Sequence, residues 1–139
     1  MPSERLGKFP IIRVRGLPVI VAPADVDISN CERLRAAIVQ AAGQGHATVV
    51  VDMRATEFCD TAALGVLVLA HKRATAEGGD LRLVVGTPVV TRVLALTGLD
   101  RAMHLFSTLE QAVAELPAVV IEPVRSNRVP AAMAWLHLG

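Results

Sequence analysis

The fold is decided by a stretch in which a strand passes into a helix, Phe58-Cys59-Asp60-Thr61-Ala62-Ala63-Leu64-Gly65. Just upstream, residues 47–51 form an apolar run without alternation, which is typical of a strand covered on both faces. Downstream, residues 62–70 are almost wholly apolar and predict a helix that ends at Gly78-Gly79. Asp is a good N-cap residue, so Asp60 is expected to cap this helix and Thr61 to be its first residue.

Upstream of this stretch, the sequence predicts a hairpin followed by a helix. Ile12 and Val14 alternate with arginines, residues 16–18 (Gly-Leu-Pro) read as a turn, and residues 19–22 are apolar. Ser29 and Glu32 have the spacing of a capping box, with Ser29 as N-cap. The helix that follows is expected to end at Gly43 and Gly45.

Downstream, two further strand and helix pairs are expected. Residues 81–85 read as a strand, and Thr87 with Pro88 as the start of a helix that ends before Gly98. A short strand is expected at 103–106, and Ser107 to Glu110 as a second capping box before a helix stopped by Pro117.

Helices that alternate with apolar strands indicate the α/β class. The expected architecture is a mostly parallel central sheet with an N-terminal hairpin and about four helices packed against it. Residues 6–117 form the single predicted domain, and residues 118–139 a C-terminal tail with a possible strand at 119–121 or short helix at 131–138.

The composition argues against several classes of partner. The chain has 14 Lys and Arg against 13 Asp and Glu, so it is not expected to attract nucleic acid or an anionic membrane by its net charge. No apolar run reaches the length of roughly 18 residues that a membrane span needs. The first residues show no signal peptide, and the two cysteines have no metal-like spacing. These features favour a cytoplasmic protein without a cofactor.

Thr61 is the residue on which a chemical switch is expected. Its hydroxyl would lie at the exposed mouth of a helix, where a phosphate would meet unpaired backbone N–H groups and the positive end of the helix dipole. The phosphate would also add up to about two negative charges to a small surface. On these two residues alone, the plainer interpretation is favoured, namely that Asp60 and Thr61 do no more than start a helix.

The sequence resembles the STAS family, in particular bacterial anti-sigma-factor antagonists, from Ile11 to Leu116. Residues 24–27 (Ala-Asp-Val-Asp) resemble the family's Gly-Glu-hydrophobic-Asp segment, and residues 97–100 (Thr-Gly-Leu-Asp) its Ser/Thr-Gly-Leu segment. Residues 58–65 resemble its Phe-hydrophobic-Asp-Ser-Ser/Thr-Gly-Leu-Gly signature, with Thr61 in place of the usual Ser. Alanine stands at positions 24, 62 and 63, where the family has Gly, Ser or Thr, and Gly.

The resemblance implies a non-enzymatic protein that switches partners. Such an antagonist binds an anti-sigma factor, often a Ser/Thr kinase of the histidine-kinase-like ATPase fold, and a separate phosphatase resets it. By position, the resemblance makes Thr61 the phosphate acceptor. It implies a partner-binding face made of seven residues, Asp25, Asp27, Asp60, Thr61, Ala62, Ala63 and Leu64.

Two alternatives remain open. The chain could be a STAS scaffold or a transporter-accessory subunit that binds its partner without phosphorylation. It could also be a receiver-type phosphoprotein that uses Asp52, although a strand-end turn or surface solvation is the plainer role for Asp52, and no Lys follows Lys72. The four histidines share no metal spacing and are expected to be exposed or partly buried, and His71-Lys72-Arg73 to be solvated helix surface. Cys59 is expected in the core rather than as a nucleophile.

Overall fold

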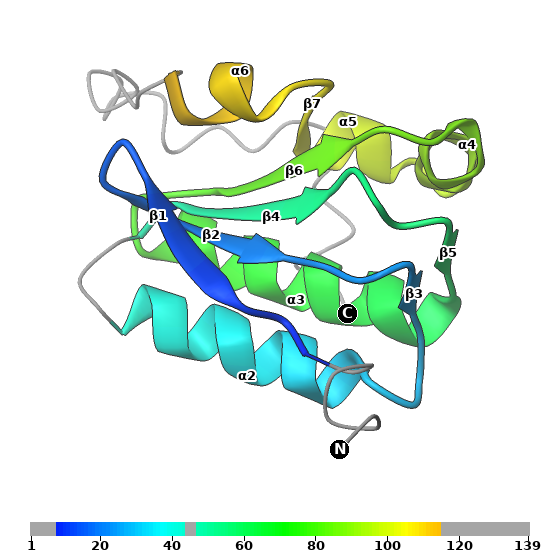
Figure 1. Cartoon of the computed structure of the whole chain (residues 1–139), viewed down its shortest axis with the longest axis horizontal. Helices are drawn as coiled ribbons and strands as arrows, with labels where there is room; N and C mark the ends of the chain where they lie inside the picture. Colours follow the sequence, from blue (N-terminus) through cyan, green and yellow to red (C-terminus); the bar gives the residue numbers. More distant parts are fainter. Residues whose placement is uncertain (1–7, 44–46, 115–139) are drawn as a thin grey trace.

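A computed structural model of the chain describes residues 8–43 and 47–114 (Figure 1). Its centre is a five-stranded sheet in the order β1-β2-β4-β6-β7. Only the first pair is antiparallel, and the other three neighbouring pairs are parallel. The strands are β1 (Ile11–Val14), β2 (Leu17–Val21), β4 (Val49–Met53), β6 (Leu81–Val85) and β7 (His104–Phe106). The predicted α/β class, with a mostly parallel sheet and an N-terminal hairpin, is confirmed.

Helices cover both faces of the sheet. In Figure 1, α2 (Cys31–Ala42) and α3 (Thr61–Ala76) run side by side beneath it, and α6 (Leu109–Ala114) lies above it. The helices α4 (Pro88–Leu96) and α5 (Leu99–Ala102) lie near the end of β6. Buried residues of α2, α3, α4 and α5 share the main core, whereas those of α6 join a smaller core on the other face.

Strand β4 shows why its sequence is apolar without alternation. All five of its residues are buried. Val49, Val51 and Met53 face the main core, whereas Val50 faces the core beneath α6. A strand with helices on both sides has apolar side chains at most positions, and the exception in β4 is Asp52, which is buried and paired with Arg54. The predicted strand at 47–51 is therefore confirmed in kind, and it runs from 49 to 53.

The hairpin turns one residue earlier than the sequence suggests. Arg15 and Gly16 are its two central residues, with φ of 53° and 84°. Two positive φ values are typical of the turns whose twist matches that of the flanking strands. Ile11 consequently lies opposite Ile20 in the register of β1 and β2.

Two of the predicted helix caps are wrong, and a third is confirmed in position but not in its hydrogen bond. Helix α2 has Asn30 at its N-cap without a side-chain cap, and the Ser29 hydroxyl donates instead to Asp27 Oδ1. The carboxylate of Asp27 is the stronger acceptor and closes its own turn, so the capping box does not form. For α6, it is Thr108 whose hydroxyl oxygen accepts the N–H of Gln111, at 3.1 Å. Thr87 stands at the N-cap of α4, but its hydroxyl donates to the carbonyl of Thr56.

Three short elements were not predicted. They are β3 (Asp25–Val26), β5 (Phe58–Cys59) and α5, and none exceeds four residues. Segments this short show no measurable periodicity. Residues 6–7, 44–46 and 115–117 of the predicted domain lie outside the described residues, and with them the predicted helix ends at Gly45 and Pro117. The whole of the predicted tail 118–139 lies outside them as well.

Candidate functional site

The candidate site lies where two loops are joined by a two-stranded sheet. Strand β3 pairs in parallel with β5, so that Asp25 lies opposite Phe58 and Val26 opposite Cys59. The N–H groups of Glu57 and Phe58 both donate to the carbonyl of Ala24, at 2.7 and 3.1 Å. Two of the three segments that carry the family resemblance, residues 24–27 and 58–65, are thereby brought together at the carboxyl ends of β2 and β4.

Asp60 connects the two loops through its carboxylate. Its Oδ1 accepts the N–H of Ala63 at 2.9 Å and so caps α3, which confirms the predicted N-cap. Its Oδ2 accepts the N–H of Ile28 at 3.0 Å, from the turn that precedes α2. Charge-assisted hydrogen bonds to backbone N–H groups are among the stronger polar contacts in proteins. One side chain therefore fixes the start of α3 relative to the turn before α2.

Thr61 is the first residue of α3 and is exposed. Its position follows from Asp60, because an N-cap residue with extended backbone leaves the next residue as the first helical one. The structure thus places the Thr61 side chain at the open N-terminal end of a sixteen-residue helix. An added phosphate here would be favoured by the helix dipole.

Asp27 lies in a closed turn beside Asp60. Its Oδ1 accepts both the N–H and the hydroxyl of Ser29, and its own N–H donates to Oδ1 of Asn30 at 2.9 Å. Hydrogen bonds from the Ser29 hydroxyl and backbone lower the pKa of Asp27, which keeps this carboxylate charged. Asn30 is buried, and its Nδ2 donates to the carbonyl of Asp25 at 2.8 Å. The turn is therefore held in shape before any partner binds.

The seven residues of the predicted face do not all reach the surface. Asp25 and Thr61 are exposed, whereas Asp27, Asp60 and Ala62 are half-buried. The side chain of Ala63 is fully buried and that of Leu64 nearly so, and both belong to the main core. The methyl group of Ala63 thus packs inward rather than standing on the surface.

Two exposed apolar side chains at this site were not predicted to belong to it. Ile28 is 76% exposed and Phe58 is 50% exposed. The sequence held a signal for each of them. Ile28 stands among polar residues of a turn. Phe58 directly precedes Cys59, which was expected in the core, and neighbouring residues of a strand face opposite sides, so Phe58 should face away from the core. Large exposed apolar side chains beside polar ones are typical of protein-binding surfaces.

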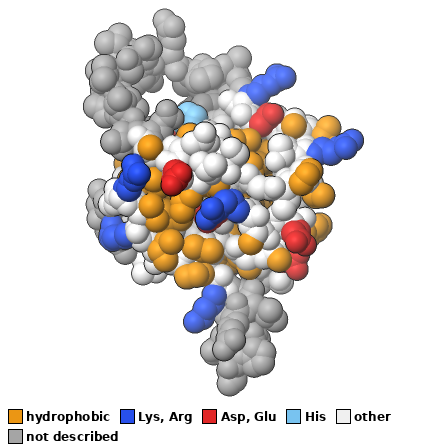
Figure 2. Space-filling view, turned by 45° about the horizontal axis from the view of Figure 1, so that its top comes forward, with side chains coloured by type: hydrophobic (Ala, Val, Ile, Leu, Met, Phe, Trp, Pro, Cys, Tyr) orange, Lys and Arg blue, Asp and Glu red, His pale blue; other side chains and the backbone are white. Residues whose placement is uncertain are grey.

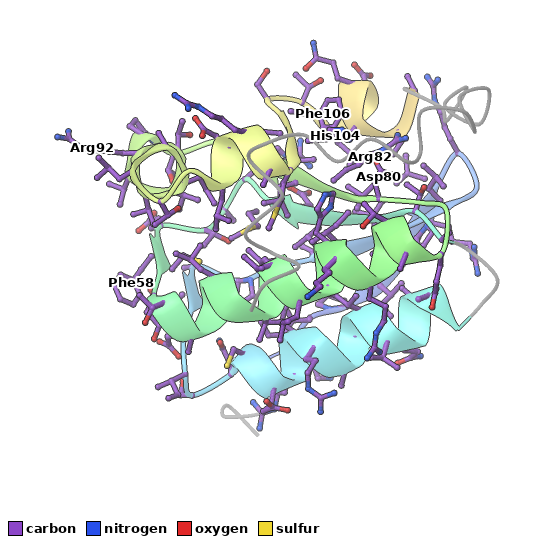
Figure 3. All side chains as sticks on the ribbon, turned by 180° about the vertical axis from the view of Figure 1, so that it is seen from behind. Phe58, Asp80, Arg82, Arg92, His104 and Phe106 are labelled. Atoms are coloured by element: carbon purple, nitrogen blue, oxygen red, sulfur yellow. The ribbon has the colours of Figure 1, made fainter. Side chains whose placement is uncertain are left out.

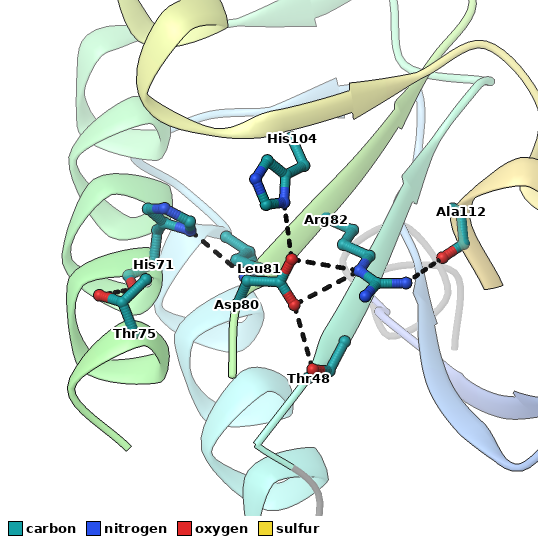
Figure 4. Close-up of polar contacts among 8 residues, drawn as sticks. All are labelled: Thr48, His71, Thr75, Asp80, Leu81, Arg82, His104 and Ala112. Carbon is teal, nitrogen blue, oxygen red and sulfur yellow. Dashed lines mark hydrogen bonds and ion pairs between the residues drawn. The ribbon is translucent and has the colours of Figure 1, made fainter. Parts of the chain in front are cut away.

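A buried polar cluster occupies the other end of the sheet, away from Phe58 (Figure 3). Asp80 accepts hydrogen bonds from Arg82 and from the Thr48 hydroxyl, and it lies 2.7 Å from Nδ1 of His104 (Figure 4). Arg82 in turn donates to the carbonyl of Ala112 in α6 at 2.7 Å. The cluster joins the sheet to α6, so its role is to hold the fold together.

His71 is more buried than the sequence suggests. It is only 2% exposed, and its Nδ1 accepts the N–H of Leu81 at 3.3 Å. The expectation that this histidine belongs to solvated helix surface is wrong, because α3 turns this position toward β6. Within residues 8–43 and 47–114, no group of His, Cys, Asp and Glu side chains could hold a metal ion.

Asp52 and Cys59 have structural surroundings. The carboxylate of Asp52 forms a two-point ion pair with Arg54, at 2.9 and 2.8 Å, and accepts the Arg54 N–H. Asp52 is therefore the strand-end turn residue of the plainer prediction, although it is buried rather than solvated. Burial, and then the charge of Asp60, raise the pKa of Cys59 to about 12, so its thiol is protonated at neutral pH.

The surface charges are mixed. On the face shown in Figure 2, basic and acidic side chains are scattered among apolar ones, and no single-sign patch dominates. Of the helices in the described part of the chain, none combines the length and the apolar character that crossing a membrane requires.

The sequence matches the STAS domain family over residues 9–112, and the chain belongs to that family. Among curated proteins it is similar to the anti-sigma-F factor antagonist RsfB of Mycobacterium tuberculosis. The two are 27% identical over 97 residues, which make up 70% of this chain and 79% of that protein. This confirms the resemblance stated from the sequence.

Solved structures give the same result. An anti-sigma factor antagonist from Mycobacterium paratuberculosis superimposes with a TM-score of 0.70 at 25% identity, covering 77% of this chain and 91% of that one. The anti-sigma factor antagonist SpoIIAA in its unphosphorylated form has a TM-score of 0.64 at 25% identity, covering 76% and 92%. The chain is thus a STAS domain similar to anti-sigma factor antagonists, a family of non-enzymatic regulators.

Proposed function

We propose that this chain is an anti-sigma-factor antagonist whose binding to an anti-sigma factor is controlled by phosphorylation of Thr61. The partner is a Ser/Thr kinase of the histidine-kinase-like ATPase fold, a phosphatase resets the switch, and transcription is regulated indirectly in the cytoplasm. One observation carries the proposal. Thr61 stands exposed at the start of α3, directly after the capping Asp60.

The surroundings of Thr61 support binding before phosphorylation and release after it. The exposed Ile28 and Phe58 provide apolar contact area, and Asp25 and Asp27 provide acidic groups next to it. A phosphate on Thr61 would add about two negative charges to this face without unfolding the helix that carries it. An apolar or acidic partner surface would then lose affinity, because it would have to desolvate or face that charge.

Names given to the relatives support the same function. RsfB is named an anti-sigma-F factor antagonist, and SpoIIAA has been solved in both an unphosphorylated and a phosphorylated form. The phosphorylated SpoIIAA superimposes on this chain with a TM-score of 0.60 at 25% identity, covering 76% of this chain and 96% of that one. The step from these proteins to Thr61 of this chain is the proposal.

A phosphorylation and binding experiment tests it. The protein is incubated with purified anti-sigma kinases and ATP, and any phosphate is located by mass spectrometry. Partner affinity is then compared for Thr61→Ala, Thr61→Glu and the control Thr75→Glu, an exposed threonine near the other end of α3. We expect phosphate on Thr61 in the wild type, none in Thr61→Ala, and weaker binding in Thr61→Glu alone.

Three other outcomes would contradict the proposal. If substitutions at Thr61 do not change partner binding and no phosphate is found there, the chain is instead a STAS scaffold or a transporter-accessory protein. Acid-labile phosphate on Asp52 would favour the receiver-type alternative. Equal weakening by Thr61→Glu and Thr75→Glu would mean a general effect of charge on α3 rather than a switch at its N-terminus.

A further inference from the structure

Helix α3 is apolar around most of its circumference between residues 62 and 70. One side, which includes Ala63, Leu64 and Leu67, is buried in the main core. The opposite side carries Gly65 and Leu69, and Leu69 is 65% exposed. A helix that is apolar all round is normally covered on all sides. The second side of α3 therefore points to a partner.

This second side forms one wall of a groove between α2 and α3, which we call the α2–α3 groove. Its volume is about 760 Å³, and its lining includes Ile28, Val39, Ala62, Gly65, Leu69 and Arg73. The two helices run in the same direction (Figure 1), so the groove follows their axes. Val39 on α2 is 47% exposed, which places an apolar ridge on each side.

The groove is continuous with the candidate site. Ile28, whose N–H is bound by Asp60, lines its first end together with Ala62, the residue after Thr61. A partner bound at Thr61 therefore reaches the groove without a break. At the far end, Arg73 lines the groove and forms no ion pair within the described part of the chain. Glu77 is the neighbouring charged residue that lines the groove there.

From these contacts we infer that the α2–α3 groove binds an amphipathic helix of the anti-sigma factor, an inference that rests on the proposed function. From Ala62 to Arg73 the groove spans about 16 Å, or roughly three helical turns. The helix places apolar residues three or four positions apart over the groove, and an acidic residue beside Arg73. Glycine and alanine at positions 65 and 62 allow its backbone to come close.

Charge substitutions in the groove test this inference. Leu69→Glu and Val39→Glu each place a charge on a groove wall, and Gln40→Glu is the matched control because Gln40 is exposed next to Val39 but does not line the groove. We expect the two groove variants to weaken binding of the purified anti-sigma factor by about tenfold or more, as at the centre of an interface. The control should bind as the wild type does. Melting temperatures show that each variant is folded.

The outcomes separate the groove from the switch. If both groove variants bind normally and Thr61→Glu binds more weakly, the groove does not bind the partner, and the proposed switch at Thr61 still holds. If the groove variants bind more weakly and substitutions at Thr61 have no effect, the groove binds the partner and the proposed switch at Thr61 is wrong. A benzophenone amino acid at position 69 adds a second measurement, since a cross-link to the partner is expected there.

Tryptophan fluorescence tests whether the groove binds the chain's own C-terminal residues instead of the partner. Trp135 is the only tryptophan in the sequence, and there is no tyrosine. If Leu69→Glu leaves partner binding unchanged but shifts the Trp135 emission to longer wavelength, the groove binds the chain's own C-terminal residues, and the inference is overturned. If the anti-sigma factor binds none of the proteins, including the wild type, both the groove and the proposed function fail.

Discussion

Oδ2 of Asp60 accepts the backbone N–H of Ile28 at 3.0 Å, across 32 positions of sequence. The same carboxylate caps α3 through the N–H of Ala63. Asp60 therefore has two roles. It stabilises the start of α3, and it fixes the position of the exposed Ile28 relative to Thr61. The geometry of the candidate face thus depends on a side chain that is itself half-buried.

Replacing Asp60 should cost more than an ordinary helix cap. Asp60→Ala removes both acceptors, and we expect the free energy of unfolding to fall by about 1–3 kcal/mol. Asp60→Asn keeps one oxygen and should give an intermediate loss. Urea denaturation measures both. The control is Asp25→Ala, since the Asp25 carboxylate is exposed and accepts no hydrogen bond from the residues that the structure describes. A loss no larger than that of the control would show that Asp60 does not hold the two loops.

Replacing Arg82 should destabilise the sheet and α6 together. Arg82 is 3% exposed, and Arg82→Met would leave Asp80 as a buried charge and the Ala112 carbonyl without its donor. We expect a loss of about 3 kcal/mol or more in the free energy of unfolding. Arg92→Met, at an exposed position of α4, should change it by less than about 0.5 kcal/mol.

Adding Asp80→Asn to Arg82→Met provides a check on the cause. Burial raises the pKa of Asp80, but its hydrogen bond with His104 and the charge of Arg82 outweigh this and hold the pKa below its usual value. Without Arg82, much of the cost should come from the buried Asp80 carboxylate, which would keep only Thr48 and His104 as partners among the described residues. The double variant should then be more stable than the sum of the single losses predicts, and strict additivity would contradict this account.

His71 should make the protein less stable in mild acid. Burial, and then the charge of His104, lower the pKa of His71 below its ordinary value. The unfolded chain takes up a proton near pH 6.5, whereas the folded protein keeps His71 neutral to lower pH. The unfolded state therefore binds more protons, and the His71 contribution to stability is lost as the pH falls through about 6.5.

The variant His71→Asn isolates this effect. Its amide oxygen stands in for Nδ1 as the acceptor of the Leu81 N–H, and it does not titrate. Urea denaturation is measured for wild type and variant at several values between about pH 7.5 and pH 5. The stability difference between wild type and variant should shrink or reverse toward the acid end. A difference that is constant with pH would show that His71 titrates normally in the fold.

Two glycines should respond in opposite ways to alanine. Gly65 lies inside α3, and a Cβ built there has no atom within 4 Å, so Gly65→Ala should stabilise the protein by about 1 kcal/mol. At Gly79 a Cβ would overlap the backbone carbonyl group of Ala47, so Gly79→Ala should destabilise the protein by about 2 kcal/mol or more. Thermal denaturation of the two variants compares them directly. Similar melting temperatures would contradict the close approach of residues 47 and 79.

Much of the fold could be predicted because its signals are local. The buried strands β4 and β6 are mostly apolar, with Asp52 and Arg82 as the exceptions. The hairpin turn lies one residue from its predicted place, and Asp60 caps α3 as predicted. Predictions failed where two polar groups competed within one turn. Ser29 is a good N-cap residue by type, yet Asp27, two positions earlier, binds its hydroxyl and N–H instead.

By itself, the sequence determined that Thr61 opens a helix after a buried strand, because Asp60 and the apolar residues that follow specify that start locally. Tertiary structure alone decided what surrounds Thr61. The pairing of β3 with β5, the bond from Ile28 to Asp60 and the burial of Ala63 all join or cover residues distant in the chain. Such contacts depend on how the helices pack against the sheet, and no local pattern encodes that packing.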